Sequence, residues 1–449
     1  MRGLSSKMTE QTQTIPRPAL SLTEGIALVV GIVIGIGIFK TPSLIANNVE
    51  SEAAFIGVWV LGGLVTLIGA LCYAELAAAY PHSGGEYHFL SRAYGRPVAI
   101  LFGWARGTVI QPGAIAAIGF VLGDYAQQLY GLGANGPAIY AALSVIVFTA
   151  LNVAGTSEGR RTQLVLTSLT MAAILAVILT PLGVAPMPQT AVQPVSGSLG
   201  LAMILVLLTY GGWNEAAYLS AEMRDKRDTT RTLIFGTLVL TVIYVLMNVA
   251  LVGVFGLQGL RQSSAPGADL MRHAFGGYGA LLLSAIVVAT ASSTMNGTVF
   301  TGGRIYYALG QDLPLLRRLG RWDEQGQNPR NGILLQGIFA LALVGLGSIT
   351  RDGFQAMVDY TAPVFWMFLL LVGIGLFILR WRNPTGERPF RVPLYPVTPI
   401  FFCLTCAYML YSSVTYTGYG AMAGLAVVVC GIPLILLRSK ETVSTTHET

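Results

Sequence analysis

Long apolar stretches alternate with short polar segments along most of the chain. A helix needs about 20 apolar residues to cross a hydrocarbon core of roughly 30 Å, and stretches of this length recur throughout. The pattern predicts an all-α integral membrane protein with twelve transmembrane helices. The predicted helices cover residues 22–46, 53–79, 97–128, 137–154, 162–184, 199–221, 231–256, 278–308, 331–349, 356–380, 396–416 and 419–437.

The composition agrees with a location in lipid. Of the 449 residues, 53% are hydrophobic and 11% are charged, whereas soluble domains carry about 25% charged residues. Residues 1–20 and 438–449 are polar, and the first of these segments lacks the apolar core of a secretory signal. We expect both segments to be cytosolic tails of a multi-pass protein of the inner or plasma membrane.

The basic residues test this topology, because cytosolic loops of membrane proteins carry an excess of Lys and Arg. If the N-terminus is cytosolic, 22 of the 27 basic residues fall on the cytosolic side, four fall on the opposite side, and Arg106 lies within the third helix. This asymmetry predicts that both termini face the cytosol. It also accounts for the net charge of +6 without nucleic acid as a partner.

Two predicted helices carry glycines near their centres. In the first helix Gly35 and Gly37 flank Ile36, and in the sixth helix residues 210–215 combine paired glycines with polar side chains. Glycine lets membrane helices pack closely, but it also lets a helix unwind where it lines a cavity. Two Gly-interrupted helices at corresponding positions of two halves are typical of a transporter whose site lies between inverted repeats.

The ends of two broken helices suit a zwitterionic ligand. Unpaired N–H groups at the start of a helix favour an anion, and unpaired C=O groups at its end favour a cation. We therefore predict that amides at residues 35–37 bind a carboxylate and that carbonyls around residues 208–211 bind an ammonium group. The predicted substrate-binding residues are Gly35, Ile36, Gly37, Leu208, Thr209, Gly211, Trp213, Asn214 and Glu215.

Glu215 has two interpretations. A carboxylate in the middle of a membrane costs several kcal/mol unless it meets water, a partner or a ligand. It could pair with an intramembrane donor such as Arg106 or Gln111, or it could face the ligand. In the second case it would be the counter-charge for a cationic amino acid or a polyamine, which is the alternative to a neutral amino acid as substrate.

Six short motifs together resemble the amino acid-polyamine-organocation superfamily, and within it the L-type amino acid transporter-like permeases. The resemblance covers nearly the whole chain, and the motifs occur in the order typical of that family. They are Gly35-Ile36-Gly37-Ile38-Phe39, Tyr73-Ala74-Glu75-Leu76 with residues 81–87, Gln111-Pro112, Tyr210-Gly211-Gly212-Trp213-Asn214, Asn296-Gly297 with Arg304, and Arg388-Pro389-Phe390-Arg391-Val392-Pro393.

The resemblance implies a fold and an activity. The fold would be a five-plus-five inverted repeat, with helices 1–5 in residues 21–185 and helices 6–10 in residues 199–380. Helices 1 and 6 would be broken, and two added helices would occupy residues 396–437. The activity would be secondary transport of small or neutral L-amino acids by alternating access, through either exchange or ion-coupled symport.

Three departures from the family pattern bear on substrate and coupling. Ile36 replaces a small hydroxyl residue but keeps the amide, and Leu208 stands where L-type transporters carry a gating Phe. Thr170 stands where many relatives have a Lys. The ammonium group of that Lys fills the position that a cation occupies in the sodium-coupled members of the superfamily. The missing ammonium group leaves room for an ion at this position.

A sodium site is therefore one interpretation of the hydroxyls on helix 8. Na⁺ would then be a coupling ion, and we expect no other cofactor. Such hydroxyls complete a sodium site with helix 1 carbonyls in the sodium-coupled cousins. The alternative is that they bond carbonyls of their own helix, as Ser and Thr often do in membranes. The candidate coupling-ion residues are Ser292, Ser293, Thr294 and Thr170.

Other partners and activities are less compatible with the sequence. Residues 131–136 lack the Cys with which animal L-type transporters bind a glycoprotein subunit, so we expect no disulfide-linked heavy subunit. An ion channel would line its pore with carbonyls or charges, and a membrane enzyme would need a catalytic constellation that the four scattered histidines do not form. The sequence assigns no role to Arg106, Glu75 or Asp359.

Overall fold

Helices make up almost all the regular structure in the computed structural model. Among the described residues, the other regular feature is an isolated bridge between Asp323 and Asn328, so the predicted all-α fold is confirmed. The described residues are 21–35, 37–82, 85–155, 160–188, 197–214, 225–323, 328–350 and 352–436.

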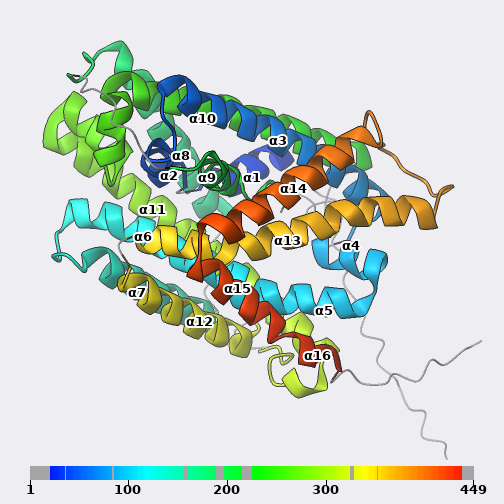
Figure 1. Ribbon diagram of the computed structural model, residues 1–449. Coiled ribbons are helices and arrows are strands. Elements are labelled where there is room, and N and C mark those ends of the chain that lie inside the picture. Colours follow the sequence, from blue (N-terminus) through cyan, green and yellow to red (C-terminus); the bar gives the residue numbers. More distant parts are fainter. Residues whose placement is uncertain are drawn as a thin grey trace, which may run out of the picture.

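The long helices lie side by side in a bundle (Figure 1). Their bounds in chain order are α1 Leu22–Val33, α2 Gly37–Ala46, α3 Glu52–Ala79, α4 Gly85–Tyr94, α5 Arg96–Ala105, the π-helical turn η1 Arg106–Ile110, α6 Gln111–Leu129, α7 Gly136–Val153, α8 Arg160–Leu179, the 3₁₀ turn η2 Thr180–Leu182, α9 Leu199–Thr209, α10 Lys226–Gln262, α11 Pro266–Asp312, the 3₁₀ turn η4 Pro314–Leu316, α12 Arg330–Ser348, α13 Gly353–Arg382, α14 Val397–Tyr416, α15 Tyr419–Val429 and α16 Ile432–Leu436.

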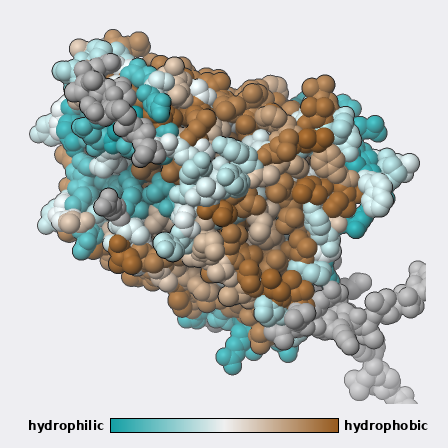
Figure 2. Space-filling view, viewed as in Figure 1, coloured by the Kyte–Doolittle hydropathy of each residue, from teal (hydrophilic) through white to brown (hydrophobic). Residues whose placement is uncertain are grey.

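Within the described residues, eight helical segments are long and apolar enough to cross a membrane, and three shorter helices are also apolar. One of the eight, Arg96–Leu129, runs through α5, η1 and α6. Figure 2 shows hydrophobic side chains over the middle of the visible face and hydrophilic side chains gathered toward its ends. This distribution is what a bundle needs when lipid surrounds its middle and water its ends.

The helix breaks expected from the glycines are present in the backbone. α1 ends at Val33 and α2 begins at Gly37, while α9 ends at Thr209 and a turn follows it. In that turn Gly212 has φ 100°, a left-handed conformation that glycine adopts without steric cost. α2 packs against α9, and α1 packs against α10, so the two breaks face one another inside the bundle.

Two further backbone irregularities were not predicted. Gly256 (φ 64°) interrupts α10 and Gly276 (φ 67°) interrupts α11. The first kink coincides with the predicted end of the span at residues 231–256. The sequence missed the helical turns on either side of residues 263–265, because they are too short and too polar to cross a membrane.

Glycines also set how closely the helices approach. A Cβ atom on Gly424 of α15 would lie 2.2 Å from the backbone oxygen of Tyr360 on α13. Gly345 of α12, by contrast, is exposed and has no atom of the described residues within 4 Å of its Cβ position. The two positions are therefore a matched pair, one in a tight helix contact and one on an open helix face.

We predict that Gly424→Ala destabilises the protein by about 1–3 kcal/mol, because the added methyl group meets rigid backbone. Gly345→Ala should be neutral or stabilising by up to about 1 kcal/mol, because alanine favours a helix interior. The test is the melting temperature of the purified protein in detergent. Equal melting temperatures for the two variants would contradict the α13–α15 packing.

Candidate functional site

The two helix breaks meet at Gly37 and Thr209. A Cβ atom on Gly37, the first residue of α2, would lie 3.4 Å from Cγ2 of Thr209, the last residue of α9. The hydroxyl oxygens of Thr209 and Thr41 are 2.9 Å apart, and Thr41 donates to the Gly37 carbonyl at 3.0 Å. The start of α2 and the end of α9 are therefore joined directly by side-chain hydroxyls.

Tyr244 of α10 bridges the same two breaks. Its hydroxyl lies 2.9 Å from the carbonyl oxygen of Val33 and 3.3 Å from that of Thr209. A hydroxyl has one proton to donate, so at any moment only one of these two carbonyls accepts it. The Val33 carbonyl also accepts from the Gly35 amide at 2.6 Å. Because a carbonyl oxygen has two lone pairs, the carbonyl without the Tyr244 proton keeps acceptor capacity for a ligand donor.

Tyr244 is a residue that the sequence analysis missed. Its ring is fully buried and packs against Tyr210 and Trp59 at centroid distances of 5.0 and 5.9 Å. A buried tyrosine hydroxyl usually has a hydrogen-bond partner, so a tyrosine in the middle of an apolar span was the available signal. The sequence alone did not say which carbonyl would be that partner.

The helix ends at the breaks present backbone groups of opposite polarity. α2 begins with N–H groups that its own helix cannot satisfy, and α1 and α9 end with carbonyls. The nearest described atom to a Cβ atom on Gly35 is the Val33 oxygen at 3.8 Å, so there is space beside this residue. Ile36 and Glu215 lie outside the described residues.

The predicted residues of the α9 turn do not all lie at the junction. Leu208 is half-buried, and its carbonyl accepts a hydrogen bond from the amide of Gly211 at 3.0 Å. The Trp213 ring packs against Tyr73 at a centroid distance of 4.8 Å, and Gly69 of α3 makes room for it. Trp213 is therefore part of the packing between this turn and α3.

Asn214 belongs to a buried polar cluster around Glu86 of α4. Its amide donates to Oε1 of Glu86 at 2.9 Å, and the Tyr73 hydroxyl donates to the same oxygen at 2.8 Å. Arg106 of η1 donates to Oε2 of Glu86 at 3.1 Å. This cluster fixes the turn after α9 to α4 and to the π-helical turn, a type of irregularity that frequently occurs at functional sites.

From the sequence, Arg106 and Gln111 are candidate partners of Glu215. In the structure Arg106 forms an ion pair with Glu86, and the side chain of Gln111 donates to the carbonyl of Thr298 at 3.1 Å. Both candidate donors thus have contacts that sequence reasoning did not anticipate. The signal for Glu86 was available, because it is an acidic residue beside a predicted span.

The candidate coupling-ion residues lie where α8 meets α11. The hydroxyl oxygens of Thr170 and Thr290 are 2.7 Å apart. Ser292 donates to the Val288 carbonyl at 2.8 Å, and Thr294 donates to the Thr290 carbonyl at 3.1 Å. These last two bonds are the own-helix bonds that the sequence analysis gave as the alternative, and Ser293 between them is buried.

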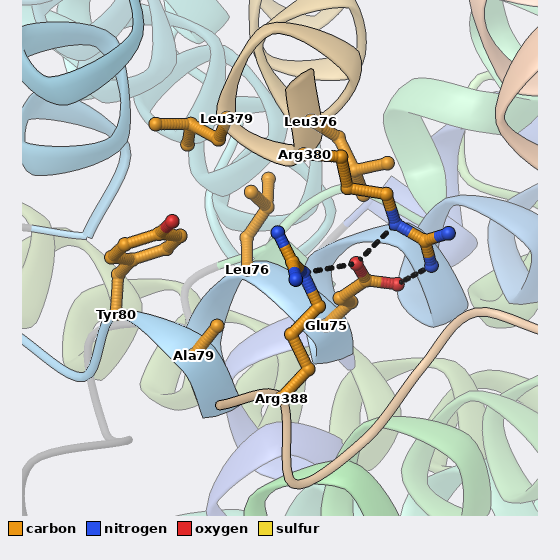
Figure 3. A pocket seen from close by; sticks show the side chains of 8 residues that line it. All are labelled: Glu75, Leu76, Ala79, Tyr80, Leu376, Leu379, Arg380 and Arg388. Carbon is orange, nitrogen blue, oxygen red and sulfur yellow. Dashed lines mark hydrogen bonds and ion pairs between the residues drawn. The ribbon is translucent and has the colours of Figure 1, made fainter. Parts of the chain in front are cut away.

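A separate small cleft lies at the predicted cytosolic end, around Glu75 (Figure 3). Glu75 accepts from Nε of Arg380 at 2.6 Å, lies 3.4 Å from Nε of Arg388, and accepts from the Val392 amide at 2.7 Å. These bonds tie α3 to the end of α13 and to the segment before α14. The cleft is lined by Glu75, Leu76, Ala79, Tyr80, Leu376, Leu379, Arg380 and Arg388.

The Glu75 cleft is a structural clamp, because its charged groups are already satisfied by one another. A bidentate pair between an arginine and a carboxylate adds geometric specificity as well as energy. Asp359 of α13, the third residue left without a role, accepts from Gln355 at 2.7 Å. Neither acid lies at the junction of the helix breaks.

The break between α1 and α2 meets the end of α9 inside an apolar bundle. Residues 20–433 match the amino acid permease family over nearly the whole chain. The chain belongs to the amino acid permease family. The resemblance read from the six motifs is thereby confirmed. The family is one of membrane transporters, and with the apolar helices it identifies a multi-pass membrane protein.

Individual relatives are similar over most of their lengths. The b(0,+)-type amino acid transporter 1 of Mus musculus is 29% identical, over 91% of this chain and 85% of the relative. The cystine/glutamate transporter of Homo sapiens is 26% identical, over 93% and 84%. The serine/threonine exchanger SteT of Bacillus subtilis (strain 168) is 26% identical, over 95% and 98%. The relatives are thus amino acid transporters, including an exchanger.

We predict that Tyr244→Phe weakens transport while the fold is kept. The variant loses the hydroxyl that holds the Val33 and Thr209 carbonyls at the junction, so the carbonyls proposed to bind the ammonium group are less well positioned. A loss of about 1 kcal/mol, the usual contribution of one hydrogen bond, corresponds to roughly fivefold in affinity. KM for amino acid uptake into proteoliposomes should rise by about this factor.

The matched control is Tyr94→Phe, which removes another hydroxyl-to-carbonyl bond, to Leu371 at 2.7 Å, away from the helix breaks. This variant should leave KM unchanged. Equal changes in KM for the two variants would contradict a specific role of the Tyr244 hydroxyl at the helix breaks.

Proposed function

We propose that the chain is a secondary transporter of small or neutral L-amino acids that works by alternating access. The observation that carries this proposal is the junction of Gly37, Thr209 and Tyr244, where helix ends of opposite polarity meet. Membership of the amino acid permease family supports the same class of activity.

The substrate backbone matches the polarity of the junction. The first amides of α2 would bind the carboxylate, since a helix N-terminus favours an anion. The carbonyls of Val33 and Thr209 would bind the ammonium group, one of them being left without the Tyr244 proton. Backbone groups would bind both charged groups of the substrate, so other residues have to select its side chain. Leu208 is the nearest predicted determinant of the size of that side chain.

For the topology we propose twelve crossings, with both termini in the cytosol. α1 and α2 have 12 and 10 residues, so each is too short to cross alone. Together they would form the first crossing. α8, α9 and α15 would contribute further crossings in addition to the eight long segments. This assignment keeps the five-plus-five repeat, with residues 21–185 and 199–380 as its halves.

Sodium coupling remains a separate proposal within this function. Its support is the replacement of a lysine by Thr170 and the nearby hydroxyl of Thr290, 2.7 Å away. Oxygen ligands of this kind suit a hard cation such as Na⁺. If the hydroxyls of α11 only bond their own helix, uptake will not depend on sodium.

The proposed activity is tested by uptake of radiolabelled L-serine, L-leucine, L-glutamate and L-arginine into proteoliposomes. We expect saturable uptake of the neutral amino acids. Uptake that requires internal amino acid and is the same in sodium and choline buffers would indicate exchange, whereas sodium-dependent uptake into empty vesicles would indicate symport. Uptake of arginine alone would favour a cationic substrate, and no uptake of any of the four would contradict the proposal.

We predict that Gly35→Leu lowers uptake by at least about tenfold, since a loss of about 1.4 kcal/mol in affinity already has this effect. The leucine side chain would enter the space beside Gly35 and block the approach of a ligand to the backbone. Gly345→Leu on the open face of α12 is the matched control and should transport normally. Normal transport by Gly35→Leu would show that the site lies elsewhere.

A further inference from the structure

A buried ion cluster lies within one turn of the proposed site. Lys40, three residues after the start of α2, is only 6% exposed. Its ammonium nitrogen lies 2.9 Å from Oδ2 of Asp124 on α6 and 3.1 Å from Oδ2 of Asp352, the residue before α13. We name Lys40, Asp124 and Asp352 the α2 triad. It joins three helices at the predicted extracellular side.

The α2 triad has a formal charge of −1, which the start of α13 partly offsets. Asp124 and Lys40 neutralise one another, and Oδ1 of Asp352 accepts from the amide of Gln355 at 3.0 Å as the N-cap of α13. The positive end of a helix dipole stabilises such a carboxylate. The closed arrangement of the three helices therefore gives each charged group of the triad a partner of opposite polarity.

Other contacts show that α2 is held firmly at this end. The Tyr125 hydroxyl of α6 donates to the Phe39 carbonyl at 2.9 Å. Arg261 of α10 donates to the carbonyls of Ala46 and Val49, each at 2.8 Å. The Phe39 ring also packs against the Tyr125 ring at a centroid distance of 6.1 Å. Lys40 adds the charged contacts, because its ion pairs bind α2 to α6 and to the start of α13 at once.

α13 is fixed by acid–base pairs at both of its ends. Asp352 joins its start to α2, and Arg380 joins its end to Glu75 of α3. Figure 1 shows α13 running from the neighbourhood of α2 and α6 to the opposite end of the bundle. If the extracellular side opens, α2 has to separate from α6 or from α13, and the α2 triad has to break.

We propose that the α2 triad is an ionic latch that keeps the extracellular side closed, and that Lys40 is a positioning residue for the start of α2. Lys40 and Gly37 are about 4.5 Å apart along the helix axis, at about 1.5 Å per residue. A movement that breaks the latch therefore also displaces the amides proposed to bind the substrate carboxylate. This inference rests on the proposed function, because it describes regulation of that same site.

Opening does not leave the charges of the latch unsatisfied. In the closed state Lys40 is buried and the aspartates are partly shielded from water, and in the open state water hydrates all three groups. Because desolvation opposes the attraction between buried charges, such a pair can be close to balanced between the two states. A substrate that binds the two states unequally can then shift the population.

The first experiment uses the double variant Lys40→Gln with Asp124→Asn, which removes the Lys40–Asp124 pair. Asp352 then loses its ion pair as well, but its side chain is 30% exposed and it still caps α13. A rise in the outward-open fraction from about 10% to about 50% would lower the apparent external KM about fivefold. The maximal rate should fall as well, because each cycle has to close the extracellular side. A variant that had merely lost folded protein would show a lower rate at an unchanged KM.

The matched control is Arg272→Gln. Arg272 is another cation on the predicted extracellular side, and it pairs with Asp269 at 2.7 Å and with Gln128 at 2.6 Å. It does not touch the α2 triad, so KM and the maximal rate should stay as they are. Lys40→Arg, which keeps the positive charge, should lie closer to the original protein than the double variant does.

A second experiment needs no transported substrate. Thr41→Cys, in a background with the four native cysteines replaced by serine, places a thiol beside the latch, at the buried contact of α2 with Thr209. A membrane-impermeant maleimide added outside should label it slowly, and at least about fivefold faster when the double variant is also present. Arg272→Gln should not change the labelling rate.

The outcomes separate the latch from the proposed function. Unchanged labelling in the double variant would overturn the latch even if amino acid uptake is normal. Faster labelling in a protein that transports none of the tested amino acids would support the latch and count against the proposed substrate. Faster labelling with a lower external KM would support both.

Discussion

A peptide carbonyl or amide inside a bilayer has no water to bond, so each break in a membrane helix creates groups that must find partners within the protein. This constraint governs the centre of the structure. α1 and α9 end within reach of one hydroxyl, that of Tyr244, which has a single proton for two carbonyls. The acceptor capacity that remains, together with the amides at the start of α2, is what a zwitterion can use.

The same cost of burial explains where the charged side chains lie. Glu86 meets Arg106, Glu75 meets Arg380 and Arg388, and Asp124 meets Lys40. The Glu75 and Asp124 pairs connect helices that are distant in the sequence, whereas Glu86 and Arg106 are 20 residues apart. Each pair fixes the relative position of the elements that carry it. A buried charge is costly on its own and acceptable in a pair. Helices joined by such a pair can move apart only when the pair breaks.

The structure brings some of the predicted site residues together and places others apart. Gly37 and Thr209 do meet. Trp213 instead packs against Tyr73, and Asn214 bonds to Glu86. The reason is geometric: a turn of a few residues points successive side chains in different directions, so neighbours in the sequence of the turn reach different parts of the bundle.

The sequence by itself determined the helical class, most of the apolar segments, the helix breaks in α1–α2 and after α9, and the family. These follow from hydrophobic length, glycine position and short motifs, all of which are local. Only the tertiary structure decided which polar groups meet: Tyr244 and Val33 are 211 residues apart, and Asn214 and Glu86 are 128 apart. An apolar helix can turn any of its sides toward its neighbours in lipid, so only the packing of the whole bundle selects these partners.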